Sequence, residues 1–93
     1  MNRITLEGLK PEEAYLLYEE TDSEICVVKT FVDPQYRGKG LAKKLMEKFM
    51  EETKSSKKQL TATCSYAKSY LLKADDERID KAKLQEVAES CRL

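Results

Sequence analysis

The segment from Thr30 to Ala42 constrains this chain most, because it runs from an apolar strand through a glycine-bearing turn into an amphipathic helix. Such a segment binds anions, since the first N–H groups of a helix lack intrahelical partners and carry the positive end of the helix dipole. Gly38 and Gly40 let a ligand approach the backbone closely. The glycines precede no Lys-Ser/Thr pair and do not have the dinucleotide spacing, so another kind of pyrophosphate ligand is predicted.

Hydrophobic periodicity and turn residues predict the remaining elements. Strands are expected at residues 4–6, 14–18 and 25–32. The segment 14–18 could also belong to a helix that starts after Pro11. We predict a strand there, because the strand at 25–32 needs a neighbour with which to pair. An amphipathic helix at 38–54 precedes a strand at 59–64, a short helix at 66–74 and a charged helix at 77–90. The expected contacts of this last helix are Ile79, Leu84, Val87, Ala88 and Cys91. The order βββαβα plus a C-terminal helix predicts an α/β layered (α+β) fold with a mostly antiparallel sheet.

Composition limits the class of protein. A chain of 93 residues suits one domain over 1–93, and 17 basic residues balance 17 acidic ones, so neither nucleic acid nor an anionic membrane is an expected partner. The chain shows no membrane-spanning apolar run and no signal-peptide core, which favours a cytoplasmic location. Cys26, Cys64 and Cys91 are widely spaced and the chain has no histidine, so reduced thiols and no metal site are expected.

The turn matches the pattern Gln/Arg-x-x-Gly-x-Gly/Ala twice, through Gln35, Gly38 and Gly40 and through Arg37, Gly40 and Ala42. This is the acyl-CoA-binding turn of the Gcn5-related N-acetyltransferases (GNAT), and the chain resembles that superfamily over nearly its whole length. The Cys64-Ser65-Tyr66 motif after the second apolar strand is similar to that of a very small subgroup. The resemblance implies a GNAT-like fold, an acetyl-CoA (CoA) ligand and transfer of the acetyl group to an amine.

The resemblance also implies which residues bind the ligand. The pantetheine arm would lie between splayed strands and contact the main chain of Phe31, Val32 and Asp33. The pyrophosphate would lie on the turn, at Gln35, Arg37, Gly38, Lys39, Gly40, Leu41 and Ala42. Arg37 or Lys39 would add a charge-assisted contact, although a solvated Lys39 fits the sequence equally well.

Catalysis without histidine leaves two routes open. An amine attacks the thioester directly, or Cys64 takes the acetyl group first. Cys64 is predicted where a strand ends and a helix begins, which favours the thiolate; its alternative role is a small buried apolar residue. In the superfamily a tyrosine of this helix protonates the departing CoA thiolate, a role open to Tyr66 or Tyr70, for which core packing is the alternative.

The sequence therefore favours an acetyl-CoA-dependent N-acetyltransferase acting on an amine acceptor, either a small molecule or a protein amine. A CoA-binding or sensing module without turnover is the alternative, followed by a protein-interaction domain without cofactor. Two departures from the subgroup bear on the acceptor. Lys29 stands where a histidine is usual, and Asp75–Leu93 forms a charged extension.

Overall fold

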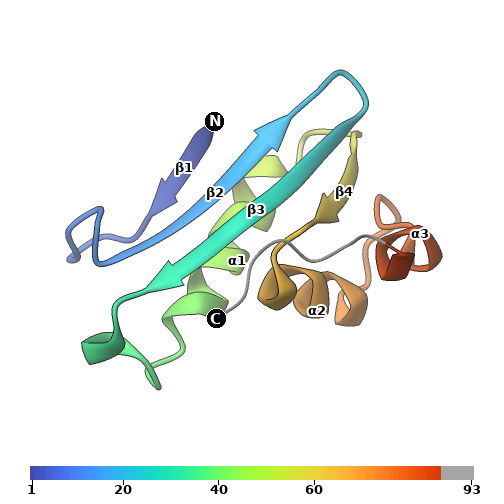
Figure 1. Ribbon diagram of the computed structural model, residues 1–93. Coiled ribbons are helices and arrows are strands. Elements are labelled where there is room, and N and C mark those ends of the chain that lie inside the picture. The colour runs from blue at the N-terminus through green and yellow to red at the C-terminus, as the bar shows by residue number, and fades with distance from the viewer. Residues whose placement is uncertain (87–93) are drawn as a thin grey trace.

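The computed structural model describes residues 1–86, in which four strands form one sheet with helices packed on it (Figure 1). The strands β1 (Asn2–Thr5), β2 (Ala14–Glu20), β3 (Glu24–Val32) and β4 (Gln59–Ala62) lie in that order across the sheet. β1 to β3 are antiparallel neighbours, whereas β4 runs parallel to β3. The helices are α1 (Leu41–Thr53), α2 (Ser65–Lys73), α3 (Lys81–Glu86) and a 3-10 helix η1 (Pro34–Tyr36). The predicted βββαβα order, terminal helix and mostly antiparallel sheet are confirmed.

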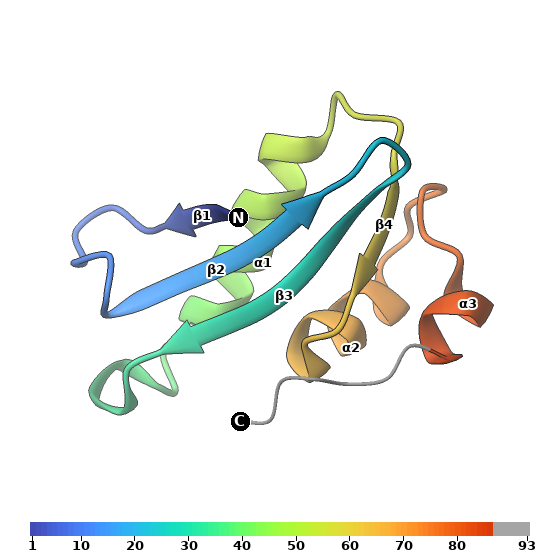
Figure 2. The ribbon, with the colours of Figure 1, turned by 45° about the horizontal axis from the view of Figure 1, so that its top comes forward.

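The core forms between the sheet and α1, which lies behind β2 and β3 in both views (Figures 1 and 2). Leu45, Met46 and Phe49 of α1 are fully buried there. The Tyr18 ring of β2 meets the Phe49 ring edge-on, with the ring centres 5.3 Å apart. Side chains alternate along a strand, so Tyr15 points to the opposite face, where its ring stacks on that of Phe31.

β3 contains a bulge, which shifts its register with β2. Lys29 pairs with Leu17 but Val27 pairs with Tyr18, so Val28 is an extra residue. The buried positions accordingly change phase, from Ile25 and Val27 before the bulge to Thr30 and Val32 after it. The bulge therefore lets both halves of the long strand face the same core.

β3 and β4 separate at the same place. Their pairing ends with Val27 opposite Ala62, although β3 continues to Val32. The amides of Thr63 and Cys64 both donate to the Val27 carbonyl, at 3.0 and 3.4 Å, and the chain then enters α2. We call the region where residues 28–32 of β3 diverge from the start of α2 the strand fork.

Some element boundaries differ from the sequence predictions. α1 begins at Leu41 rather than residue 38, because Gly38 and Gly40 have φ of 84° and 73°, outside the right-handed helical region. β4 ends at Ala62 rather than residue 64, since Thr63 and Cys64 converge on one carbonyl instead of extending the ladder. α2 starts one position early, with Cys64 as its N-cap.

The predicted helix at 77–90 is only partly correct. Residues 76–79 form a turn in which the Ile79 amide donates to the Asp76 carbonyl. α3 starts after Asp80, whose carboxylate accepts from the Lys83 amide. Ile79 and Leu84 are buried as expected. Val87, Ala88 and Cys91 lie outside the described residues.

Candidate functional site

The turn after β3 is shaped by Asp33, Pro34 and the hydrogen bonds of η1. The Asp33 carboxylate accepts from the Gln35 amide at 3.1 Å, and the Asp33 carbonyl accepts from the Tyr36 amide at 2.8 Å. The Arg37 amide donates to the Pro34 carbonyl at 3.3 Å. The amides of residues 35–37 are thus used inside the turn, and the donors available to a ligand lie further along the chain.

Glu13 anchors this turn to the loop between β1 and β2. Its carboxylate accepts from the Tyr36 hydroxyl and from the Lys10 amide, both at 2.7 Å, while its carbonyl accepts from the Asp33 amide at 2.8 Å. Two hydrogen bonds lower the pKa of Glu13: the one from the Lys10 amide has the larger effect, and the one from the Tyr36 hydroxyl has the smaller effect. The same hydrogen bond to Glu13 raises the pKa of Tyr36. The pairing of Glu13 with Tyr36 was not predicted from the sequence, because a contact between distant loops has no local signal.

Gly38 and Gly40 open the path to the N-terminus of α1. Apart from its chain neighbours, a Cβ at either glycine would meet no atom of residues 1–86 within 4 Å, so this part of the chain leaves the space beside the turn open. The first hydrogen bond of the helical ladder runs from the Lys44 amide to the Gly40 carbonyl at 3.1 Å. The amides of residues 41–43 therefore precede the ladder and carry the positive end of the α1 dipole.

A pocket of about 240 Å³ lies at this point, and we call it the turn pocket. The predicted cofactor-binding residues that line it are Val32, Arg37, Gly38, Gly40, Leu41 and Ala42. Tyr36, Lys43 and Tyr66 also line it. Tyr36 lies inside the turn predicted to bind pyrophosphate but had no role of its own, Lys43 was not predicted, and Tyr66 was predicted only as a proton donor. The structure thus brings the end of β3, the glycine turn, α1 and the start of α2 together.

Other predicted ligand residues lie beside this pocket rather than in its wall. The Phe31 side chain stacks on Tyr15 on the far face of the sheet, so only its main chain can face the strand fork. Asp33 and Gln35 hold the turn together. Lys39 lines a separate cavity of about 360 Å³, and its ammonium nitrogen lies 5.7 Å from the centre of the Tyr36 ring.

Arg37 folds back onto the end of β3. Its Nε donates to the Val32 carbonyl at 3.0 Å. The neighbouring Asp33 amide points toward β2, so the Val32 carbonyl points to the other side, where β4 has already diverged. Arg37 therefore sits between the strand fork and the turn pocket.

Cys64 lies at the strand fork as the N-cap of α2. Its side chain is 0% exposed, and Sγ is 3.2 Å from Oγ1 of Thr30, which is also buried. The start of a helix favours a thiolate electrostatically, whereas burial disfavours it. The structure confirms the predicted position between strand and helix and places the thiol inside the core.

Tyr66 and Tyr70 project from α2 toward α1. Both are half-buried, and burial is the main reason that the pKa of each is raised; the charge of Glu47 adds to both shifts. Each is therefore a neutral phenol near pH 7, able to donate a proton. Tyr66 reaches the turn pocket, whereas Tyr70 lines an adjoining cavity of about 310 Å³.

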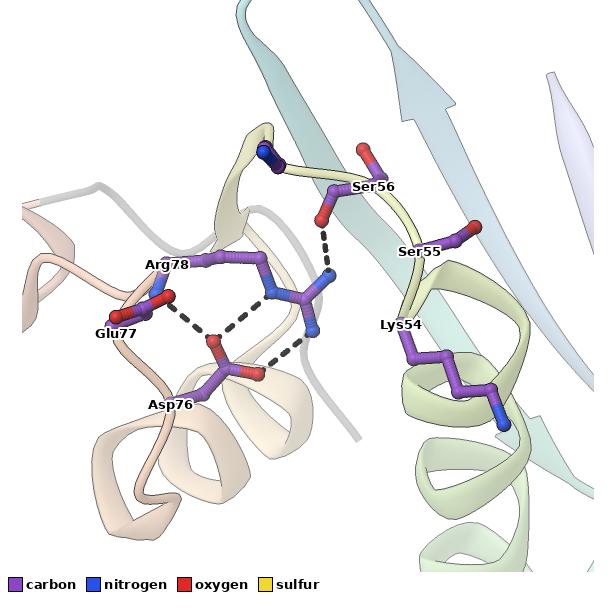
Figure 3. Close-up of a pocket in the computed structure, with 7 residues that line it drawn as sticks. Lys54, Ser55, Ser56, Asp76, Glu77 and Arg78 are labelled. Carbon is purple, nitrogen blue, oxygen red and sulfur yellow. Dashed lines mark hydrogen bonds and ion pairs between the residues drawn. The ribbon is translucent and has the colours of Figure 1, made fainter.

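A cavity of about 720 Å³, larger than the turn pocket, lies elsewhere, between the end of α1 and residues 76–78 (Figure 3). Arg78 lines it and is held in place by four hydrogen bonds: Nε and Nη2 donate to the two oxygens of Asp76, and Nη1 donates to the carbonyls of Thr53 and Ser56. The Leu60 amide also donates to the Arg78 carbonyl. Arg78 thus joins the end of α1, the start of β4 and the segment before α3.

Over residues 1–86, no cluster of three or more histidine, cysteine or acidic residues is arranged to hold a metal ion. Nor does this part of the chain contain a helix long and apolar enough to cross a membrane.

A family model described as GCN5-related N-acetyl-transferase matches residues 3–80. The match covers most of the chain, including β2, β3, β4, all of β1 except its first residue and the whole turn pocket, and the chain belongs to this family. A comparison with curated proteins gives no match. The predicted superfamily is therefore confirmed, while membership of the small Cys-Ser-Tyr subgroup stays a prediction.

Proposed function

We propose that this chain binds acetyl-CoA and transfers its acetyl group to an amine acceptor. The observation that supports this best is the turn pocket, in which two glycines of positive φ precede the amides of residues 41–43, and these amides have no hydrogen-bond acceptor among residues 1–86. That arrangement suits a pyrophosphate, because several N–H groups and the helix dipole converge on one anion. Family membership supplies the class of reaction.

The residues present fit the parts of CoA. The amides of residues 41–43 would hold the pyrophosphate, with Arg37 adding a charged contact. The strand fork would take the pantetheine arm beside the main chain of Phe31, Val32 and Asp33. Gln35 and Lys39 would lie at the outer edge of the turn, beside the pyrophosphate.

Acetyl-CoA supplies an acetyl group activated as a thioester. In direct transfer, the nitrogen of a neutral acceptor amine bonds to the acetyl carbon and the carbon–sulfur bond breaks. The nitrogen loses one proton to water, and the CoA sulfur takes one proton from a donor that water then reprotonates. Tyr66 is the proposed donor of that proton, because it lines the turn pocket and its raised pKa keeps the phenol protonated. Tyr70 is the less favoured donor, since it lies outside that pocket.

The alternative route forms a thioester on Cys64 before the amine attacks. Its position at the strand fork favours this role, but complete burial and the contact with Thr30 oppose it. The geometry therefore supports direct transfer better. Intact mass spectrometry after incubation with acetyl-CoA tests the choice, because a Cys64 thioester adds one acetyl group that hydroxylamine removes and that Cys64→Ala lacks.

Thiol release from acetyl-CoA, measured with a panel of amines, tests the transfer itself. Tyr66→Phe is expected to lower kcat by about 10²-fold with CoA affinity nearly unchanged, since only the proton donor is removed. Cys64→Ala is expected to stay within a few-fold of wild type. If Cys64→Ala folds and binds CoA but loses transfer, the thioester route replaces direct attack.

A CoA-binding or sensing module without turnover is the second candidate. The absence of histidine and the buried Cys64 thiol favour it, because they leave few groups for proton transfer. Tight CoA binding without thiol release for any amine in the panel would support it. Failure to bind CoA would exclude both functions and favour a protein-interaction domain.

A further inference from the structure

The sheet face that points away from α1 carries a cluster of rings and positive charges. Each residue of this cluster is next to a buried residue of its own strand, so its side chain points away from the core. Figure 1 looks onto this face, and none of the helices within residues 1–86 covers β1 or β2 there. We call the set the far-face cluster; its members are Arg3, Tyr15, Leu17, Lys29 and Phe31.

The pairing of the strands places the far-face cluster in two rows. Arg3 of β1 pairs with Leu17 of β2, which pairs with Lys29 of β3. In the next row, Tyr15 pairs with Phe31. Arg3 and Lys29 are two strands apart, which corresponds to roughly 10 Å between their Cα atoms. The two cations therefore stand on either side of an apolar side chain.

The rings and the cations hold one another in place. The Tyr15 and Phe31 rings stack with their centres 5.3 Å apart. The guanidinium carbon of Arg3 lies 4.5 Å from the centre of the Tyr15 ring, and the Lys29 ammonium lies 5.8 Å from the centres of both rings. Contacts between cations and ring faces are favourable, so they orient two side chains that are otherwise exposed.

Neither cation of the cluster has a carboxylate partner in the described part of the chain. Lys54 and Lys58 form ion pairs with glutamates, whereas Arg3 and Lys29 form neither an ion pair nor a hydrogen bond within residues 1–86. Their N–H groups remain available to an acceptor, and a carboxylate is the acceptor that a guanidinium or an ammonium binds most strongly in proteins. The surface is therefore complementary to a negatively charged partner.

We propose that the far-face cluster docks an acidic segment of a partner protein. One carboxylate of the segment would bind Arg3, a second would bind Lys29, and an apolar side chain between them would pack on Leu17. An extended chain covers roughly 10 Å in about three residues, so acidic residues at positions i and i+3 of the segment fit the two cations. This surface lies across the sheet from the turn pocket, which α1 helps to line, and is separate from the proposed transfer.

The ring contacts favour a protein over a nucleic acid as the partner. Single-stranded nucleic acids bind by stacking their bases on exposed ring faces. In this cluster Tyr15 and Phe31 stack on each other, and the two cations lie against the same rings. The chain also has no net charge, so no wider positive field attracts phosphates. A carboxylate needs only the N–H groups of the two cations.

An NMR titration of the isotope-labelled whole chain with a blocked Glu-Leu-Leu-Glu peptide tests the proposal. Amide shifts are expected to change at the far-face cluster, and a Gln-Leu-Leu-Gln peptide should bind about tenfold more weakly, because both charge pairs are lost. Arg3→Gln and Lys29→Gln should each weaken the acidic peptide by about threefold, as one exposed charge pair implies. Lys44→Gln is the matched control, since this exposed lysine belongs to α1 on the other side of the sheet and should change nothing.

The outcomes that would overturn the proposal are equally specific. Affinity that is unchanged in both Arg3→Gln and Lys29→Gln would do so, as would shift changes confined to another face or equal binding of a Lys-Leu-Leu-Lys peptide. Tighter binding of a thymidine oligonucleotide than of the acidic peptide would make nucleic acid the partner instead. Circular dichroism checks that the variants are folded. CoA is absent from these titrations, so their result does not depend on the proposed function.

Discussion

At the scale of single residues, Gly40 determines where α1 begins and leaves the approach to its amides open. Its φ of 73° suits glycine, and within the described part of the chain no atom beyond its two neighbours lies within 4 Å of where a Cβ would be. Asparagine and aspartate tolerate this conformation better than other residues. Charge at the turn can therefore be changed separately from the backbone conformation.

Gly40→Asp is expected to weaken CoA binding at least tenfold, corresponding to about 1.4 kcal/mol, because a carboxylate would occupy the amides and repel phosphate. Gly40→Asn carries the same backbone strain without the charge and should lose much less affinity. Calorimetry on folded protein measures both. Equal affinities for wild type and Gly40→Asp would contradict the turn assignment.

Glu13 and Tyr36 provide a residue-scale prediction about pH. Glu13 has a lowered pKa in the folded chain, so its contribution to stability is present above its ordinary value of 4.5 and is lost as pH falls below that through the native pKa. Tyr36→Phe removes one of the bonds that lower it. The pKa of Glu13 should then rise toward 4.5, and a carbon-detected NMR titration of its carboxyl group measures it. A pKa that does not move would show that the Lys10 amide alone causes the shift.

At the scale of elements, the bulge in β3 and the strand fork occur together after Val27. A bulge bends its strand and increases the local twist. Because Val28 is the extra residue, removing it would restore regular pairing with β2 while Val27, Thr30 and Val32 still face the core. The bulge can therefore be deleted without reversing the buried face.

Deletion of Val28 is expected to leave a folded protein, destabilised by about 1 kcal/mol, with CoA affinity reduced at least tenfold because the fork narrows. Deletion of Phe31 is the contrasting variant, since it would turn Val32 outward and cost several kcal/mol. Chemical denaturation and calorimetry give the two quantities. Full CoA affinity after loss of Val28 would show that the bulge does not shape the site.

At the scale of the whole molecule, the proposed ligand would join parts that are distant in sequence. The turn pocket combines β3, α1 and α2, and the strand fork lies where β4 leaves the sheet. A ligand that binds only the folded chain raises its unfolding free energy by an amount set by its affinity. The stabilisation by fragments of CoA therefore reports which part of the site each fragment uses.

CoA is expected to raise the unfolding temperature well above the value reached with the same concentration of pantetheine, which lacks the pyrophosphate held by α1. Raising the salt concentration should reduce the CoA effect only modestly, since enclosed phosphates are screened weakly. Thermal unfolding followed by circular dichroism measures both. Equal stabilisation by pantetheine would contradict a pyrophosphate site at the turn.

Several features of the site could not be predicted from the sequence, for reasons that particular residues illustrate. The hydrogen bond between Glu13 and Tyr36 joins two loops, and no local pattern indicates such a pair. The run from Ile25 to Val32 is apolar enough to read as one regular strand, so the bulge at Val28 leaves no signal in it. Arg78 joins the end of α1 to the segment before α3 by donating to the backbone carbonyls of Thr53 and Ser56. Every residue type has such a carbonyl, so the sequence does not indicate which ones Arg78 contacts.

The sequence by itself determined the order of the elements, the amphipathic face of α1 and the glycine turn, because periodicity, turn residues and a short motif act over a few neighbouring positions. Only the tertiary structure decided that Cys64 is buried against Thr30, that Tyr66 reaches the turn pocket, and that β3 and β4 separate after Val27. Those outcomes depend on how α1, α2 and the strands pack on one core, and packing is a property of distant residues brought together.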